Sequence, residues 1–211
     1  MSAPVWADVS GPIRVIDGDT LDVGGTRVRL HGIDAPERDQ MCGGNGVPGW
    51  RCGAWVVGEV RARYQGQWAA CVQTDYDQRY ERIVAKCFVD GQDIGQRLVR
   101  DGLAFAYRKY SKDYDLDEKG AAVNDRGLHG QGVQAPSAYR TNKQHARSTV
   151  NLQTAPEGCV IKGNINSDDV RIYHVPGQRD YERTTIKTEQ GERWFCTEDE
   201  ALSAGWRRAK R

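Results

Sequence analysis

Apolar and polar residues alternate with a period of two in three short runs near the start of the chain. The runs are Ile13–Ile16, Thr20–Val23 and Thr26–Leu30, and Asp-Gly and Gly-Gly pairs separate them. Such alternation is typical of half-buried strands, and these glycine-containing pairs are typical of tight hairpin turns. The pattern therefore predicts an antiparallel meander of three strands.

The spacing of apolar residues beyond this meander predicts helices and further strands. Helices are predicted at Trp50–Tyr64, Ile94–Gly102 and Asp113–Asp125, and strands at Trp68–Thr74 and Arg82–Val89. Apolar residues recur three or four positions apart in the first two helical segments. Five short strands and about three helices in this order predict a mainly β fold with α, in which the strands close into a small barrel.

The second half of the chain changes in composition and predicts a separate small domain. Gln134–Gly158 is rich in Gln, Ser, Thr and Asn, lacks apolar periodicity and is interpreted as a linker. Short apolar runs after Cys159 predict a small α+β domain. The predicted boundaries are 1–10 for an N-terminal remnant or mature N-terminus, 11–140 for the barrel, 141–157 for the linker and 158–211 for the C-terminal accessory domain.

The composition is that of a globular protein and provides no general attraction for nucleic acid. Of the 211 residues, 38% are hydrophobic and 28% charged, and the formal net charge is +1. Taken alone, this charge favours no contact with a polyanion, so any such contact requires a local cluster of arginines. The longest apolar runs are too short to span a bilayer, and we expect no membrane insertion.

Six cysteines fall into three local couples. They are Cys42 with Cys52, Cys71 with Cys87, and Cys159 with Cys196. None belongs to a C-x-x-C pair, which disfavours zinc and favours three disulfides. Disulfides predict an exported protein, periplasmic or secreted, and Val5-Trp6-Ala7 is similar to the end of a signal peptide that has been removed. The alternative is six free or buried thiols in a reducing cytosol.

Carboxylates are concentrated in two turns, Asp17-Gly18-Asp19-Thr20 and Asp34-Ala35-Pro36-Glu37, with Arg29 on the predicted strand between them. Neighbouring carboxylates repel one another, and a bound cation relieves that repulsion. Asp19, Asp34 and a turn carbonyl make an oxygen-only site suited to Ca²⁺, or less tightly to Mg²⁺ or Mn²⁺. Glu37 can serve as a general base and Arg29 can bind a phosphate oxygen. The alternative is a polar turn pinned by ion pairs.

Two further blocks, Asp77–Arg82 and Leu98–Ala104, follow these turns. In order and spacing, the four blocks together resemble the thermonuclease family, the staphylococcal-nuclease-like domains, over roughly residues 11 to 140. The resemblance implies an OB-type five-stranded barrel with helices. It also implies a Ca²⁺-dependent endonuclease that hydrolyses DNA and RNA with low sequence specificity and leaves 3′-phosphate ends.

The resemblance implies a calcium site built from the two carboxylate-rich turns. Asp19, Asp34 and the backbone carbonyl of Ala35 would bind the ion, and Asp17 and Thr20 would support them. Ala35 stands where the best-known family member has threonine. The exchange is compatible with calcium binding if only the backbone carbonyl is used.

The resemblance also implies how the substrate is held and attacked. Arg29 and Arg82 would bind the scissile phosphate, Glu37 would act as the base or orient the water, and Tyr107 and Tyr110 would line the nucleotide pocket. We expect DNA and RNA as substrates, no obligate protein partner and a monomer.

One departure from the family pattern keeps an alternative function open. Glu81 stands where glycine is usual, and its carboxylate can pair with Arg82 or repel phosphate. The alternative is therefore a non-catalytic nucleic-acid-binding module on the same barrel. The C-terminal unit resembles a small accessory module of secreted nucleases and envelope proteins. Its basic tail, Arg207–Arg211, is interpreted as a solvated terminus rather than a phosphate-binding site.

Overall fold

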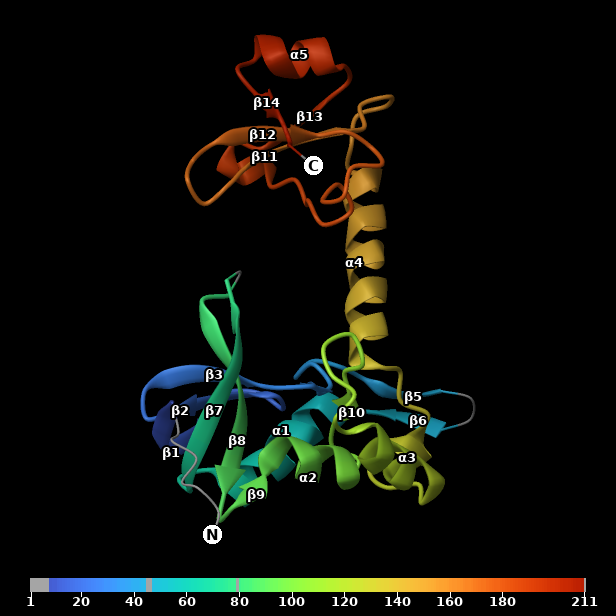
Figure 1. The fold of residues 1–211 in the computed structure, drawn as a ribbon. Coiled ribbons are helices and arrows are strands. Elements are labelled where there is room, and N and C mark those ends of the chain that lie inside the picture. Colours follow the sequence, from blue (N-terminus) through green and yellow to red (C-terminus); the bar gives the residue numbers. More distant parts are fainter. Residues whose placement is uncertain (1–7, 45–46, 79, 211) are drawn as a thin grey trace. The chain divides into compact units, whose positions relative to one another are not determined.

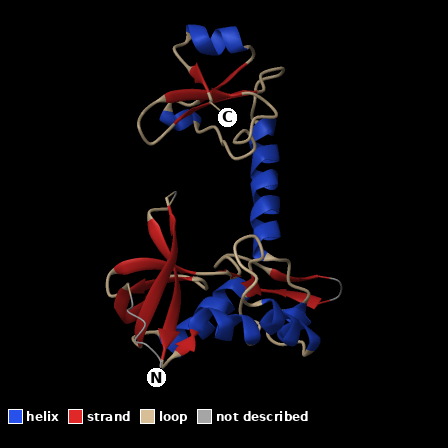
Figure 2. Cartoon of the chain, viewed as in Figure 1, coloured by secondary structure: helices blue, strands red, loops and turns tan. Residues whose placement is uncertain are grey.

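The computed structural model describes residues 8–44, 47–78 and 80–210. The Val5-Trp6-Ala7 segment, predicted as the end of a signal peptide, lies outside these residues. The chain forms two compact units, residues 1–137 and 138–211, and Figures 1 and 2 show the helices and strands of each. No helix within the described ranges is long and apolar enough to cross a membrane.

Five strands of the first unit close into a barrel. They are β1 (Val9–Val15), β2 (Thr20–Val23), β3 (Thr26–Leu30), β7 (Trp68–Asp77) and β8 (Arg82–Val89). The order is β3-β2-β1-β7-β8, and a parallel pairing of β3 with β8 closes the ring. A short strand, β9 (Gln92–Asp93), pairs with β8 in the antiparallel direction. The predicted five-stranded barrel is confirmed.

Alternate residues of the barrel strands point inward and form the core. Leu21 and Val23 of β2 and Val28 and Leu30 of β3 are at most 1% exposed. Each such side chain contributes about 1.5–3 kcal/mol when it leaves water. Cys71 and Cys87 lie opposite each other on β7 and β8 and form a buried disulfide, as predicted.

Three α-helices lie wholly within the described part of the first unit. They are α1 (Cys52–Tyr64), α2 (Ile94–Arg100) and α3 (Asp115–Val123). Asp93 caps α2, because its side chain accepts a hydrogen bond from the backbone N–H of Gln96 at 3.2 Å. The predicted helix at Trp50–Tyr64 begins two positions late, since Trp50 is the last residue of a strand.

Short elements complete the first unit beside the barrel. They are β4 (Ile33–Asp34), β5 (Cys42–Gly44), β6 (Val47–Trp50), β10 (Phe105–Ala106) and the 3-10 helix η1 (His129–Gln131). The glycine-rich sequence around Cys42 was assigned no strand in the sequence analysis, and here β5 and β6 pair as an antiparallel hairpin. The predicted disulfide between Cys42 and Cys52 ties this hairpin to the start of α1.

The described residues of the second unit form a four-stranded sheet and two α-helices. Its elements are α4 (Pro136–Gln153), β11 (Ile161–Ile165), β12 (Arg171–His174), η2 (Thr188–Gln190), β13 (Arg193–Phe195), α5 (Glu198–Ser203) and β14 (Arg207–Arg208). The strand order is β13-β11-β12-β14, and the predicted disulfide between Cys159 and Cys196 is formed.

Helix α4 occupies most of the segment interpreted as a linker. Few of its residues are apolar, and polar side chains provide some of its buried contacts. Asn151, for example, is 8% exposed and exchanges two hydrogen bonds with the backbone of Ile186. Proline suits the first turn of a helix, and Pro136 is the first residue of α4.

A buried lysine in the second unit escaped the sequence analysis. Lys162 on β11 is 0% exposed, and its Nζ donates to Ser148 Oγ and to the carbonyl oxygen of Tyr181, each at 3.1 Å. The ammonium group also lies 4.4 Å from the centre of the Tyr181 ring. Burial lowers the pKa of Lys162. These contacts fasten the C-terminal half of α4 to the sheet.

Candidate active site

The two carboxylate-rich turns meet at one end of the barrel. Thr20 and Arg29 are directly opposite each other in the β2–β3 ladder. Asp19, the residue before β2, therefore lies beside the Arg29 side chain. Asp34 ends β4, four residues after β3. A Cβ on Gly18 would come within 2.7 Å of the Ala35 Cβ, so the first turn packs directly on the second.

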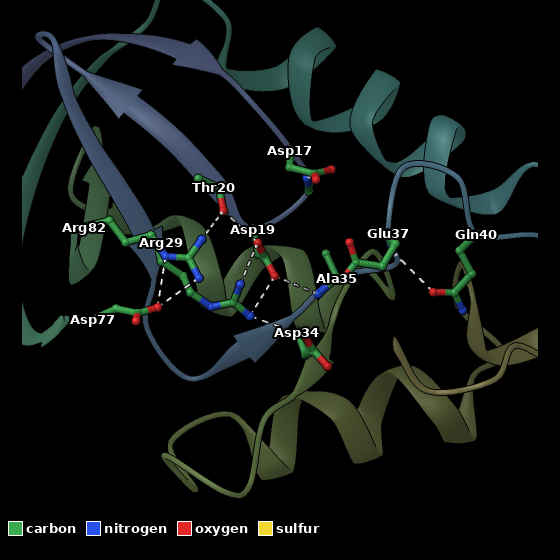
Figure 3. A network of polar contacts seen from close by, with 11 residues as sticks. Asp17, Asp19, Thr20, Arg29, Asp34, Ala35, Glu37, Gln40, Asp77 and Arg82 are labelled. Carbon is green, nitrogen blue, oxygen red and sulfur yellow. Dashed lines mark hydrogen bonds and ion pairs between the residues drawn. The ribbon is translucent and has the colours of Figure 1, made fainter. Parts of the chain in front are cut away.

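The guanidinium group of Arg29 lies between the two predicted metal ligands. Its Nη2 is 3.0 Å from Asp19 Oδ2 and 3.3 Å from Asp34 Oδ1, as Figure 3 shows. Asp19 and Asp34 are only 7% and 3% exposed. Two buried carboxylates and one guanidinium carry a net charge of −1, so Arg29 balances only part of the negative charge.

The donor set fits a hard divalent cation. Asp19 and Asp34 present oxygens toward one point, and the backbone of Ala35 is adjacent, since its N–H donates to Asp19 Oδ2 at 3.4 Å. Among the described residues, no three His, Cys, Asp or Glu side chains gather to hold a metal. The site therefore offers few protein ligands, and water or substrate oxygens would supply the rest. Ca²⁺ accepts such mixed oxygen coordination.

Arg82 reaches the same end of the barrel from a distant strand. Its Nη2 donates to Asp77 Oδ2 at 3.1 Å, and its Nη1 donates to Thr20 Oγ1 at 3.4 Å (Figure 3). The guanidinium also lies 4.8 Å from the centre of the Tyr80 ring. Asp77 and Tyr80 were not predicted as site residues, although both lie in the block that carries Arg82.

Glu37 and Asp17 lie on the side of the site away from Arg82. The backbone N–H of Glu37 donates to Gln40 Oε1 at 3.3 Å, and Gln40 is completely buried (Figure 3). Gln40 in turn donates to the carbonyl oxygen of Gln134 at 2.8 Å. The sequence analysis missed this residue, which holds the Glu37 turn in place.

The acidity of Asp17 reflects its crowded surroundings. Burial raises the pKa of Asp17, and the carboxylates of Asp19 and Glu37 raise it further. A hydrogen bond from the backbone N–H of Gly18 and the positive charge of Arg38 act in the opposite direction. Burial is therefore the main cause of the raised pKa of Asp17, and the two neighbouring carboxylates add to it.

The two predicted tyrosines lie next to each other near Asp34. Phe105 is paired with Asp34 in the β4–β10 ladder, and the backbone N–H of Tyr107 donates to the carbonyl oxygen of Gly32 at 2.8 Å. The rings of Tyr107 and Tyr110 are 5.0 Å apart, edge to face, and Tyr110 is 63% exposed. Their exposed faces can stack against a base.

Glu81 adopts a backbone conformation that suits the glycine expected here from the family resemblance. Its φ is +47°, in the left-handed region that side chains with a Cβ disfavour. Among the residues that the structure describes, Arg82 forms its ion pair with Asp77 and not with Glu81. Glu81 therefore affects the turn before Arg82 chiefly through its backbone.

Replacing Glu81 by glycine is expected to stabilise the protein by about 0.5–1 kcal/mol, because it relieves the left-handed strain at that residue. Urea-induced unfolding measures the change. Glu81→Gln is the matched control, because it removes the charge and keeps the Cβ, and its stability should equal that of the wild type. Equal stabilisation by glycine and glutamine would show that charge, not backbone strain, is the cause.

Comparisons with known proteins agree with this architecture. A family described as staphylococcal nuclease homologue matches residues 27–127, and a family described as ArfC matches residues 141–208. The succinoglycan biosynthesis protein ExoI of Rhizobium meliloti is 31% identical over 142 residues, which cover 65% of this chain and 68% of the relative.

Two further relatives carry nuclease names. An uncharacterized endonuclease of Escherichia coli is 33% identical over 138 residues, covering 62% of this chain and 83% of the relative. A micrococcal nuclease of Shigella flexneri is 30% identical over 165 residues, covering 69% of this chain and 88% of the relative. The similarity therefore extends over most of the length of each relative.

Proposed function

Because this chain belongs to the staphylococcal nuclease family, we propose that it is a Ca²⁺-dependent endonuclease that hydrolyses DNA and RNA with low sequence specificity and leaves 3′-phosphate ends. The observation that carries the proposal is the convergence of Asp19, Asp34, Arg29 and Arg82 at one end of the barrel. Carboxylates and forked guanidinium groups on one surface suit a phosphodiester with a bound cation.

In this proposal the cation site consists of Asp19, Asp34 and the carbonyl oxygen of Ala35, with Asp17 and Thr20 in support. A bound Ca²⁺ would supply positive charge to a phosphate oxygen. The carboxylates already converge on a single cationic group, Arg29, which supports their assignment as ligands.

The chain's own residues would divide the remaining tasks. Arg29 and Arg82 bind the non-bridging phosphate oxygens and the additional charge of the five-coordinate transition state. Glu37 accepts a proton from the attacking water as the new phosphorus–oxygen bond forms. The bond to the 5′-oxygen breaks, and this oxygen takes up a proton from solvent and leaves as a hydroxyl. Tyr107 and Tyr110 bind a base beside the phosphate.

The alternative is a barrel that binds nucleic acid without cleaving it. The observation in its favour is the ion pair between Arg82 and Asp77, which engages the guanidinium group before any phosphate arrives. Phosphate would have to compete with this carboxylate. A catalytic and a purely binding barrel differ in one readily measured property, the release of shorter products.

The decisive experiment is an assay of plasmid DNA, single-stranded DNA and RNA with Ca²⁺, with product ends identified by mass spectrometry. Cleavage of all three with 3′-phosphate ends is expected. Binding without cleavage would favour the alternative, and 5′-phosphate ends would refute the proposed bond scission.

We also propose that the protein acts as an exported monomer. The three disulfides support an oxidising compartment, periplasmic or extracellular. Titration of thiols under denaturing, non-reducing conditions should find none free. Light scattering should give the mass of one chain, and the mass of two chains would refute the monomer.

A further inference from the structure

Two tryptophans and an arginine form an aromatic, cationic surface where the β5–β6 hairpin joins α1. The rings of Trp50 and Trp55 are 5.4 Å apart in an edge-to-face contact, and Arg51 lies between them in the sequence. Arg51 is exposed, and within the described residues its guanidinium has no ion pair. Trp50, Arg51 and Trp55 are called the tryptophan shelf below.

The backbone connects the tryptophan shelf directly to the Glu37 turn. The N–H of Gly53 donates to the carbonyl oxygen of Gln40 at 3.2 Å. A Cβ on Gly53 would fall 1.7 Å from the carbonyl oxygen of Glu37, so only glycine permits this approach. The disulfide between Cys42 and Cys52 fixes the same junction. The tryptophan shelf is therefore held in a fixed place beside Glu37.

Packing of α1 against the barrel does not depend on Trp55. Val56, Val57 and Val60 provide the apolar face that α1 packs against the barrel, and each is at most 3% exposed. Trp55 is 37% exposed, so part of its side chain is accessible to solvent. Exposed aromatic faces next to an unpaired cation are typical of surfaces that bind single-stranded nucleic acid, where bases stack and the cation contacts phosphate.

The tryptophan shelf and the tyrosine pair adjoin different residues of the candidate site. Tyr107 and Tyr110 adjoin Asp34 through the β4–β10 ladder, whereas the shelf adjoins Glu37. Glu37 and Gln40 lie at the end of the site away from Arg82 (Figure 3). A polynucleotide extends in both directions from the phosphate being cleaved. Its two flanks can therefore meet two separate aromatic surfaces.

We propose that the tryptophan shelf binds the nucleotide on the Glu37 side of the scissile phosphate in a single-stranded substrate. The base stacks on Trp55, and Arg51 contacts the next phosphate. This inference rests on the proposed nuclease function for its position in the substrate path. It goes further in assigning a second base-binding site to residues outside the catalytic cluster.

The test is the affinity of the full chain for a short single-stranded DNA, measured by fluorescence anisotropy with excess chelator so that cleavage is prevented. Trp55→Ala is expected to weaken binding about tenfold through loss of one stacked base. Trp55→Phe should retain most of the affinity, which separates stacking from misfolding. Trp68→Ala is the matched control, because Trp68 is an exposed tryptophan on β7. The DNA affinity of this variant should equal that of the wild type.

Hydrolysis of bis(4-nitrophenyl) phosphate, which has no bases, provides an independent readout. Its rate in Ca²⁺ should be the same in Trp55→Ala and the wild type. Unchanged DNA affinity in Trp55→Ala would overturn the inference even if the protein is a nuclease. Weaker DNA binding in Trp55→Ala, together with no cleavage of DNA or RNA by the wild type, would support the shelf and refute the proposed activity.

Discussion

Removal of divalent cations is expected to reduce DNA hydrolysis to background, and addition of Ca²⁺ to restore it. The reason is electrostatic. Asp19 and Asp34 are nearly buried and share one guanidinium group, so the cluster without metal repels an approaching phosphate. A bound divalent cation reverses the sign of the local charge and attracts the phosphate. A fluorescent single-stranded DNA assay with EGTA, followed by Ca²⁺ in excess, measures both halves of the prediction.

Thermal unfolding provides a readout of the metal site that does not depend on activity. Ca²⁺ should raise the melting temperature of the wild type, because a ligand bound only to the native state stabilises it. Asp34→Asn should abolish that increase. Asp22→Asn is the control, since Asp22 on β2 pairs with Arg14 away from the cluster and should leave the Ca²⁺ response intact. Hydrolysis that survives excess chelator would refute the metal assignment.

Much of the barrel end could be predicted from the sequence because its contacts are local. Asp19, Arg29 and Asp34 are joined by two short turns, and the register of one hairpin is enough to bring them together. Arg82 is different, because its place depends on the parallel pairing of β3 with β8. Alternation within a strand does not specify its distant neighbour, so only the family resemblance indicated this residue.

Other features escaped prediction because their sequence signals were weak. Helix α4 contains few apolar residues, and Lys162 cannot be told from a surface lysine in the sequence. Gln40 gives no chemical signal, although its side chain positions the Glu37 turn. The roles of α4, Lys162 and Gln40 depend on contacts with residues that are distant in the sequence. Hydrophobic patterning carries no information on such partners.

Replacing Glu37 by glutamine is expected to lower kcat by at least about 10², because general-base catalysis contributes about 10²–10⁴ and an amide cannot accept the proton. Glutamine has nearly the same shape, so the turn held by Gln40 should remain intact. Single-turnover hydrolysis of DNA in saturating Ca²⁺ measures the chemical step directly.

The interpretation of this variant depends on what it leaves unchanged. DNA affinity under chelation and the Ca²⁺-dependent rise in melting temperature should both equal those of the wild type, since Glu37 is assigned to neither. Asp39→Asn is a matched control, because Asp39 is an exposed acid two positions along the same turn. It should retain the wild-type rate. A wild-type rate in Glu37→Gln would exclude proton transfer to this residue, and catalysis would then rest on the two arginines and the metal alone.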